Sequence, residues 1–448
     1  MKKEDNDKII EKSLNYSVKD GVAASISVNV GENFISPYAI ALKATNFQLG
    51  LLSALPNLIP IQLLTKSAME KFSRKKIMMM GIFVQILMWI LIASLGFLSL
   101  KGFSWAPIAL IILFTVYTLA ALFMSPAWAS WMKDLTEKVK LGKYFGMRNK
   151  VCGILGLAAL ILAGILLNKF KEIGYVFFGF AILFLLAAIF RTISRSYLKK
   201  QHEPELKIKK EAYFSFWQFV KKAPTNNYGL FVIFIALINF AISISGPFFS
   251  PYMLKVLKFD YVTYIMINLV ISAIATLLTM SLWGKFIDKY GCVKTMKINV
   301  WLIPVVPVLW LISSNVYWLV AVQLISGTIW AGFNLAAGTF TYQAVTNQRI
   351  NLCVAYSSVF NGLAVFLGAL IGGLITSLNI TFMNVFLFVF LVSGIARVGV
   401  ILILFNKIKE IRPAKSKKPV AFLIKEVLRS LKDSYLSPIY YVRNHKSS

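Results

Sequence analysis

The chain has 448 residues, of which 58% are hydrophobic and 15% charged, and its mean hydropathy is +0.70. A soluble domain is nearer half apolar and a quarter charged, so too little polar surface remains here to cover a water-facing globule. The composition therefore predicts a protein of the lipid bilayer. Three cysteines exclude a disulfide framework, and two histidines are too few for a histidine-based metal or haem site. We expect no metal and no cofactor.

Twelve mostly apolar runs are long enough to cross a membrane, since a spanning helix needs about 20 residues. In the first half they cover residues 22–42, 47–65, 77–99, 106–128, 151–168 and 174–193. In the second half they cover residues 228–250, 261–283, 298–314, 317–341, 353–377 and 381–405. Backbone polar groups in lipid must be satisfied within the segment, which favours helices. The predicted fold class is an all-α polytopic membrane protein with twelve transmembrane helices.

The basic residues predict the topology. The net charge of +30 comes from 48 Lys and Arg against 18 Asp and Glu. With the N-terminus inside, 41 basic residues fall on inner segments and six on outer loops. The remaining one, Arg397, lies in the last run, within reach of snorkelling to the inner interface. The positive-inside rule then predicts a multi-pass protein of the cell membrane with both termini cytoplasmic.

In a soluble protein, such a charge would indicate nucleic acid as a partner. Here we expect no nucleic acid. The basic residues instead face the anionic inner leaflet of the bilayer, which is the partner that this distribution predicts.

A charged segment separates two sets of six runs. We predict a cytoplasmic N-terminal tail (1–21), an N-terminal six-helix bundle (22–193), a cytoplasmic central loop (194–227), a C-terminal six-helix bundle (228–405) and a basic cytoplasmic C-terminal tail (406–448). In the central loop Phe216, Trp217 and Phe219 follow a charged stretch, which predicts a short interfacial helix. The tail segment 420–435 predicts another. The alternative is that both are solvated linkers with an apolar face.

The two halves resemble each other in sequence. Ser36-Pro37-Tyr38 matches Ser250-Pro251-Tyr252 at an offset of 214. Residues 66–78 align with 284–296, and residues 153–166 align with 362–375, at offsets of 218 and 209. Three matches in the same order argue against chance. Parallel repeats of six helices, with a binding cavity at the repeat interface, are a transporter architecture.

The segment GKFIDKYGCVKTM (284–296) resembles the loop motif of the major facilitator superfamily. That motif has Gly, three residues, Asp, a basic residue, any residue, Gly and further basic residues, and the matching positions are Gly284, Asp288, Lys289, Gly291 and Lys294. In the first-half copy Lys66 and Ser73 replace the glycines and Glu70 replaces the Asp, while Lys71 and Arg74 keep the basic character. Residues 126–150 also resemble the loop between helices 4 and 5 of bacterial and archaeal members.

The resemblance covers residues of about 20–407. It implies the major facilitator fold, with two pseudo-repeated six-helix bundles, and a central cavity lined by helices 1, 4, 7 and 10. A carboxylate at a helix end that faces basic residues across a cytoplasmic seam makes a charge-assisted contact, which closes in one conformation and opens in the other. The candidate cytoplasmic gate comprises Glu70, Lys71, Arg74, Asp134, Arg148, Gly284, Asp288, Lys289, Gly291 and Lys294. The alternative is that its acids merely balance basic neighbours.

Charges within hydrocarbon are costly and usually functional, and Glu32 lies about ten residues into the first run. Polar residues repeat on one face of the first, seventh and tenth runs. The candidate substrate and proton cavity comprises Glu32, Asn29, Asn33, Ser36, Asn239, Ser243, Gln323, Trp330 and Asn334. The alternatives are that Glu32 joins a polar packing contact and that Trp330 fills space between helices.

No phosphate-binding loop of an ATP-driven pump and no nucleophile–base–acid set is present in the sequence, so we expect no enzyme. The main hypothesis is a secondary active transporter that moves a small organic solute by alternating access. Glu32 favours proton coupling, which makes the solute and protons the expected partners of a monomer. The alternative is a membrane-embedded binding or assembly protein that keeps the fold without transport.

Overall fold

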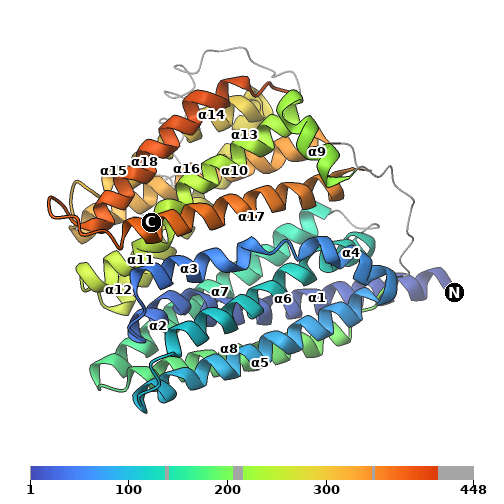
Figure 1. Cartoon of the computed structure of the whole chain (residues 1–448). Coiled ribbons are helices and arrows are strands. Elements are labelled where there is room, and N and C mark those ends of the chain that lie inside the picture. Colours follow the sequence, from blue (N-terminus) through green and yellow to red (C-terminus); the bar gives the residue numbers. More distant parts are fainter. Residues whose placement is uncertain (1, 137–140, 205–214, 346–348, 412–448) are drawn as a thin grey trace, which may run out of the picture. The chain divides into compact units, whose positions relative to one another are not determined.

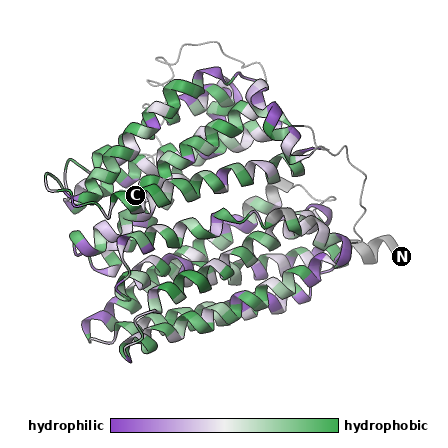
Figure 2. Ribbon diagram, in the orientation of Figure 1, coloured by the Kyte–Doolittle hydropathy of each residue, from purple (hydrophilic) through white to green (hydrophobic). Residues whose placement is uncertain are grey.

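The computed structural model describes residues 2–136, 141–204, 215–345 and 349–411. Within these ranges the chain is helical and has no β-strand, which confirms the predicted all-α class. Hydrophobic residues cover most of each long helix, and hydrophilic residues gather at helix ends and connections (Figure 2). Ten helices in the described ranges are long and apolar enough to cross a membrane. The predicted tail helix at 420–435 lies outside the described residues.

The chain divides into two compact units. Unit 1 comprises Met1–Lys210 and Ser250–Ile265, and unit 2 comprises Glu211–Phe249 and Met266–Ser448. Each unit is built mainly from one of the two sequence repeats. The exception is Ser250–Ile265, which belongs to the second repeat in sequence and to unit 1 in space.

Long helices packed side by side form unit 1 (Figure 1). Its α-helices are α1 (Lys2–Gly31), α2 (Ile35–Ala41), α3 (Asn46–Leu58), α4 (Gln62–Lys71), α5 (Arg74–Leu100), α6 (Ala106–Leu135), α7 (Leu141–Glu172), α8 (Val176–Lys199) and α12 (Tyr261–Ile265). Helix α1 packs against α7 and α8, and α5 packs against α6 and α8. A buried cluster that includes Met78, Met124 and Trp131 fills the space between α5 and α6.

The first two predicted spans are broken. A 3-10 turn at Glu32–Phe34 joins α1 to α2, and residues 59–61 separate α3 from α4. Pro60 explains the second break, because a residue before proline avoids the α conformation, and Ile59 is extended with φ −96° and ψ 112°. Each of the twelve predicted spans nevertheless falls mainly on helical residues, which is consistent with twelve transmembrane helices.

The segment Ser250–Ile265 makes specific contacts within unit 1. Lys255, in the π-helical segment Tyr252–Val256, donates hydrogen bonds from Nζ to the Ala44 carbonyl oxygen at 3.1 Å and to Asn46 Oδ1 at 3.2 Å. The Tyr261 ring on α12 lies 5.9 Å from that of Phe180 on α8. These contacts fix the segment on unit 1.

Unit 2 repeats the helical architecture. Its α-helices are α9 (Phe216–Lys222), α10 (Asn227–Ser245), α13 (Ile271–Tyr290), α14 (Cys292–Leu302), α15 (Val305–Leu309), α16 (Val316–Ala344), α17 (Ile350–Ile375) and α18 (Val385–Leu404). A 3-10 turn at Gly246–Phe248 follows α10, and the short α11 (Phe249–Pro251) crosses the boundary between the units along the chain. Helix α10 packs against α17 and α18, and α16 packs against α13 and α14 (Figure 1).

Polar residues start several of these helices by accepting hydrogen bonds from backbone N–H groups that have no helical partner. The Ser73 side chain accepts from Lys76 N at the start of α5, and the Asn226 side chain accepts from Gly229 N at the start of α10. Thr45 and Gln48 form a reciprocal capping box at the start of α3. The helix starts in both units are therefore encoded locally.

Candidate functional site

Glu32 lies in the turn between α1 and α2, and Tyr117 of α6 holds its carboxylate. The Tyr117 hydroxyl donates a hydrogen bond to Glu32 Oε1 at 2.7 Å. Tyr117 is 2% exposed, and its ring packs 4.5 Å from that of Trp89. The tyrosine is thus locked by packing, whereas Glu32 is only half-buried. The carboxylate therefore keeps one fixed donor and some freedom to bind another group.

A chain of hydrogen bonds connects Tyr117 to a second acid on α1. Gln85 of α5 donates to the Tyr117 carbonyl oxygen at 3.4 Å, and Arg191 of α8 donates from Nε to Gln85 Oε1 at 2.7 Å. Arg191 also donates to Ser194 Oγ at 3.2 Å, and Ser194 donates to Asp20 Oδ1 at 2.6 Å. Four helices therefore contribute to one polar chain that begins at Glu32 and ends at Asp20.

Sequence reasoning missed Asp20 and Arg191. Asp20 lies just before the first apolar run, yet it is 4% exposed because α1 continues through it and packs against α8. Arg191 was counted among the inner basic residues although it lies near the end of the run 174–193, and α8 extends to Lys199 and places it inside the helix. The spacing of Arg191 and Ser194, one helical turn apart, is the signal that could have identified a polar face there.

The other predicted polar residues of α1 face a neighbouring helix. Ser25 Oγ donates to the Cys152 carbonyl oxygen on α7 at 2.8 Å, and Asn29 Nδ2 donates to the Ser25 carbonyl oxygen at 2.9 Å. A methyl group on Gly156 of α7 would lie 2.6 Å from Asn29 Nδ2, so the two helices touch there. Asn33 donates to Asn29 Oδ1 at 3.2 Å, and Ser36 is half-buried. The packing interpretation therefore fits Asn29 best.

The polar residues predicted in the second half lie in unit 2, in varied surroundings. Asn239 of α10 donates to Asn361 Oδ1 of α17 at 2.6 Å, and Ser243 lies beside Gly368 of the same helix. On α16, Gln323 is 8% exposed, Trp330 is half-buried against Phe333, and Asn334 is exposed. Trp330 and Asn334 are therefore accessible on α16, whereas Asn239 is engaged by α17.

Arg74 is the centre of the candidate gate in unit 1. Its side chain is fully buried at the start of α5, and it forms ion pairs with Asp134 at 2.5 Å and with Glu203 at 3.5 Å. It also donates to Ser130 Oγ at 3.1 Å and to the Pro204 carbonyl oxygen at 2.6 Å. Arg74 thus ties the end of α6 and the chain after α8 to the start of α5.

The remaining gate candidates of unit 1 behave differently from Arg74. Glu70 and Lys71 are exposed at the end of α4, and the acids that Arg74 contacts are Asp134 and Glu203, not Glu70. Arg148 of α7 donates from Nε to the Ser17 carbonyl oxygen at 3.2 Å, and its guanidinium lies 5.1 Å from the Trp128 ring. Arg148 therefore links α7 to the N-terminal part of α1.

In unit 2 the loop motif is organised around Gly291. This residue has φ +90° and lies between α13 and α14, where a residue with a side chain would be strained. The Glu410 carboxylate, which follows α18, accepts hydrogen bonds from Cys292 N at 3.0 Å and Val293 N at 2.8 Å. An acid beyond the last helix thus caps α14, which no motif in the sequence predicted.

The other motif residues of unit 2 surround that turn. Gly284 lies within α13 and Lys294 within α14. Asp288 is exposed, and the Lys289 ammonium lies 5.0 Å from the Tyr290 ring.

The prediction that the Arg397 side chain snorkels to the membrane interface is wrong. It is 3% exposed inside unit 2 and donates to the Ile303 carbonyl oxygen at 3.1 Å and to Ser245 Oγ at 2.9 Å. The Ile303 carbonyl oxygen would normally accept from the residue four positions later, but that residue is Pro307, which has no N–H. Arg397 therefore replaces a donor that the α14–α15 break removes.

Among the described residues, no group of three His, Cys, Asp or Glu side chains is arranged to hold a metal ion. The three cysteines, Cys152, Cys292 and Cys353, are buried and form no disulfide bond. The chemistry available at the site is therefore that of the Glu32 carboxylate and of the hydrogen-bond donors and acceptors around it.

Comparisons with known proteins agree with this architecture. The model of the Major Facilitator Superfamily matches residues 22–272 and 230–442. No curated protein sequence matches the chain. A nucleoside transporter, NupG in a point-mutant form, has a TM-score of 0.69 and 14% identity, covering 88% of this chain and 100% of its own. A bacterial homologue of the iron transporter ferroportin in an inward-facing state has a TM-score of 0.64 and 17% identity, covering 89% and 98%.

A bacterial homologue of the lysosomal transporter Spinster is also similar, with a TM-score of 0.57 and 14% identity over 89% of this chain and 95% of that one. These identities are low, so the solved structures support the fold alone. The family match, in contrast, spans nearly all of the helical part of the chain. The protein is a multi-pass membrane protein, not an enzyme, and it belongs to the Major Facilitator Superfamily.

Proposed function

We propose that this protein is a secondary active transporter that moves a small organic solute by alternating access and couples its movement to protons. Membership of the Major Facilitator Superfamily supports membrane transport. The proposal adds the type of solute, the mechanism and the coupling ion. It further places the protein in the cell membrane as a monomer with both termini in the cytoplasm.

The environment of Glu32 is the observation that carries proton coupling. A carboxylate within a membrane-spanning segment is costly unless it is protonated or hydrogen-bonded. Glu32 lies where the helix is broken, it is half-buried, and Tyr117 occupies only one of its oxygens. The other oxygen of the group can take a proton or a donor group of the solute. A residue that alternates between these two partners couples their movements.

Two contacts at helix ends support alternating access. In unit 1 the Arg74–Asp134 pair joins α5 to α6, and in unit 2 Glu410 joins the end of α18 to the start of α14. Both contacts are charge-assisted and lie at the end of the helices that the charge distribution assigns to the cytoplasm. They would keep each bundle rigid while the two bundles move.

The solute class is open to a direct screen. The structural neighbour with a TM-score of 0.69 is a nucleoside transporter, so nucleosides are the first compounds to test. Sugars, amino acids and organic cations follow, because a half-buried Trp330 beside an exposed Asn334 suits a neutral or cationic solute. A ligand that binds only the folded state stabilises it, and the stabilisation grows with the ligand concentration relative to the Kd. A rise in unfolding temperature therefore identifies a compound that binds.

The test of coupling uses the compound that the screen identifies. In proteoliposomes with an imposed pH gradient, we expect Glu32→Gln to abolish the dependence of uptake on the gradient. Tyr117→Phe should reduce uptake about tenfold, because a hydrogen bond to a charged group contributes about 1.5–3 kcal/mol. Glu172→Gln is the matched control, since Glu172 is an exposed acid at the end of α7 in the same unit.

Gradient-dependent uptake by Glu32→Gln at the wild-type level would exclude Glu32 as the coupling residue. Binding in the screen without uptake by the wild-type protein would instead favour the alternative, a membrane-embedded binding or assembly protein.

A further inference from the structure

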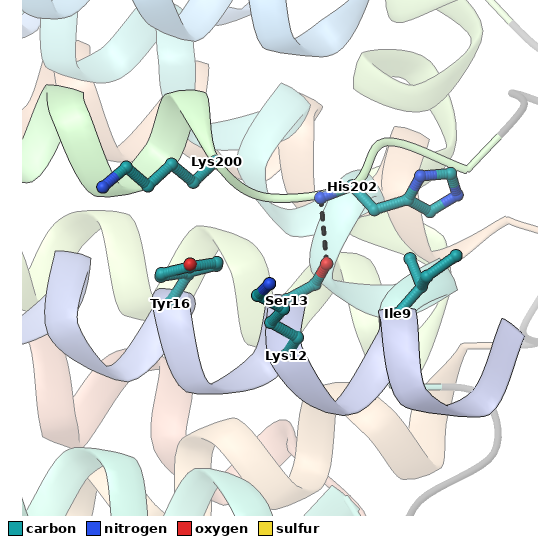
Figure 3. Close-up of a pocket in the computed structure, with 6 residues that line it drawn as sticks. All are labelled: Ile9, Lys12, Ser13, Tyr16, Lys200 and His202. Carbon is teal, nitrogen blue, oxygen red and sulfur yellow. Dashed lines mark hydrogen bonds between the residues drawn. The ribbon is translucent and has the colours of Figure 1, made fainter. Parts of the chain in front are cut away.

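A pocket of about 380 Å³ opens in unit 1 beside the first turns of α1 (Figure 3). Its lining consists of Ile9, Lys12, Ser13 and Tyr16 of α1 with Lys200 and His202, which follow α8. This part of α1 precedes the first apolar run and lies on the side that the positive-inside rule assigns to the cytoplasm.

The wall formed by His202 is held in place from two sides. The His202 backbone N–H donates to Ser13 Oγ at 2.9 Å, which Figure 3 shows as a dashed line. The His202 carbonyl oxygen accepts from Trp131 Nε1 at 2.8 Å. Trp131 is 1% exposed in the core of the unit, so the chain after α8 is anchored where it passes α1. This wall of the pocket is therefore tied both to α1 and to the core of unit 1.

Aromatic contacts position one of the two ammonium groups. The rings of Tyr16 and Tyr197 stack with their centroids 6.4 Å apart. Lys200 Nζ lies 5.9 Å from the centroid of each ring. A cation over a tyrosine ring is attracted to it. The two rings thus hold the Lys200 side chain beside the pocket.

The lining is positive and rich in donors. Two ammonium groups, an imidazole and the hydroxyls of Ser13 and Tyr16 line it, and among the described residues no carboxylate does. The acid next to His202 is Glu203, whose carboxylate lies 3.5 Å from Arg74 Nε. Glu203 is therefore already paired with Arg74.

We propose that this pocket binds a phosphate group through Lys12, Lys200 and Ser13. A phosphate presents several acceptor oxygens, which suit two ammonium groups and a hydroxyl donor. The exposed Ile9 side chain gives the pocket one apolar wall, against which the organic part of a phosphorylated molecule can lie. The phosphate belongs either to the headgroup of an anionic phospholipid of the inner leaflet or to a free phosphorylated solute. This site is independent of the transport function proposed above.

The test uses the full-length protein in nanodiscs. One arm compares phosphatidylcholine discs with discs that contain phosphatidylglycerol and counts retained lipids by native mass spectrometry. The other arm adds inorganic phosphate at increasing concentration to phosphatidylcholine discs and measures the phosphate bound to the protein in the same way. In both arms the Lys12→Gln/Lys200→Gln variant is compared with Lys8→Gln/Lys199→Gln, which removes two exposed lysines from the same segments outside the pocket.

We expect the pocket variant to lower the apparent affinity for one of the two probes about tenfold, since two charge-assisted contacts are lost. The control variant should change it less than twofold. An effect confined to phosphatidylglycerol identifies a lipid headgroup, and an effect on inorganic phosphate identifies a free anion. Equal losses in the two variants, or no loss in either arm, would overturn the proposal.

Lysine footprinting of the wild-type protein keeps the test decisive if the pocket variant does not fold. Acetylation of Lys12 and Lys200 should slow several-fold when the probe is present, while that of Lys8 and Lys199 should not. Uniform protection of all four lysines, or protection of none, would contradict a phosphate site in this pocket.

Discussion

Arg74 shows how one buried cation organises the end of a bundle. Its side chain is fully buried, whereas those of Asp134 and Glu203 are 36% and 19% exposed. The free-energy cost of removing the ion pairs from water therefore comes mainly from burying the arginine. The Pro204 carbonyl oxygen and the Ser130 hydroxyl also accept hydrogen bonds from its guanidinium. Removal of the arginine would leave several acceptors without a donor at once.

We predict that Arg74→Gln lowers the free energy of unfolding by about 3 kcal/mol, as expected when one partner of a buried pair is lost. Thermal unfolding in detergent measures this effect. Lys133→Gln is the control, since Lys133 is exposed one residue before Asp134, and it should change stability by less than about 0.5 kcal/mol.

The combined variant Arg74→Gln/Asp134→Asn should lose about 1 kcal/mol less unfolding free energy than the two single variants lose in sum, because the two residues interact directly. Strict additivity would show that the pair contributes nothing beyond its separate parts.

The sequence singled out Glu32 as an acid but not its partner, whereas Asp134 and its partner Arg74 were both gate candidates. A carboxylate within an apolar run is visible in a sequence because of its cost in lipid. Its partner depends on how each helix is rotated, and hydropathy does not determine rotation when a helix is apolar on all sides. Tyr117, Gln85 and Arg191 therefore emerged only from the packing of α5 against α6 and α8.

Among the helices, the α14–α15 break depends on a residue from elsewhere in the unit. Pro304 and Pro307 interrupt the helix and leave backbone carbonyl oxygens without helical donors. Arg397 of α18 satisfies one of them, at Ile303. The buried Arg397 thus donates to a backbone carbonyl oxygen left free by the helix break, and not to a carboxylate.

This arrangement predicts an interaction between two distant substitutions. Arg397→Met should destabilise the protein by about 2 kcal/mol, because the Ile303 carbonyl oxygen and Ser245 lose a donor. Pro307→Ala restores a backbone N–H four residues after Ile303, so the effect of Arg397→Met should fall by about 1 kcal/mol in that background. Unfolding measurements on the four proteins complete the cycle, and an unchanged effect of Arg397→Met would refute the explanation.

The two motif glycines of unit 2 should respond oppositely to alanine. Gly291→Ala should lower stability by about 1–3 kcal/mol, because its φ is +90° and a methyl group would lie 2.5 Å from Glu410 Oε2. Gly284 lies within α13, where a methyl group would lie 4.0 Å from Leu335 Cδ2, so Gly284→Ala should be neutral or slightly stabilising. Similar unfolding temperatures for the two variants would contradict this distinction.

The positions of the helices were largely predictable, and their breaks were only partly so. Long apolar runs such as 77–99 and 317–341 fall within single helices, because a segment in lipid must satisfy its own backbone. The break at Pro60 follows from a residue type that could have been recognised in the sequence. The turn at Glu32–Phe34 contains no proline, but Pro37 removes the N–H group that would bond to the Asn33 carbonyl oxygen in a continuous helix, so a proline accompanies this break too.

At the level of the whole molecule, the distribution of 41 inner and six outer basic residues makes a topological prediction. A reporter that is active only outside the membrane, such as alkaline phosphatase, should be inactive when fused to either terminus. Inserted at Gly102, in the predicted outer loop between α5 and α6, it should be active. Activity at a terminus together with silence at Gly102 would reverse the orientation.

The family and the two-repeat organisation were predictable because they rest on motifs and on long-range sequence similarity. The assignment of Ser250–Ile265 to unit 1 was not, since it depends on contacts such as that of Lys255 with Ala44. Sequence periodicity describes a helix by itself, and it does not say which bundle will bind a connecting segment.

The 3-10 turns at Glu32–Phe34 and Gly246–Phe248 have a common origin in the repeat. They are separated by 214 residues, the same offset that relates Ser36-Pro37-Tyr38 to Ser250-Pro251-Tyr252. The break therefore recurs at equivalent positions of the two repeats. Glu32 corresponds to Gly246, where a Cβ atom would meet open space. Two equivalent helix breaks thus carry different residues, and an acid in only one of them makes the two halves of the protein chemically unequal.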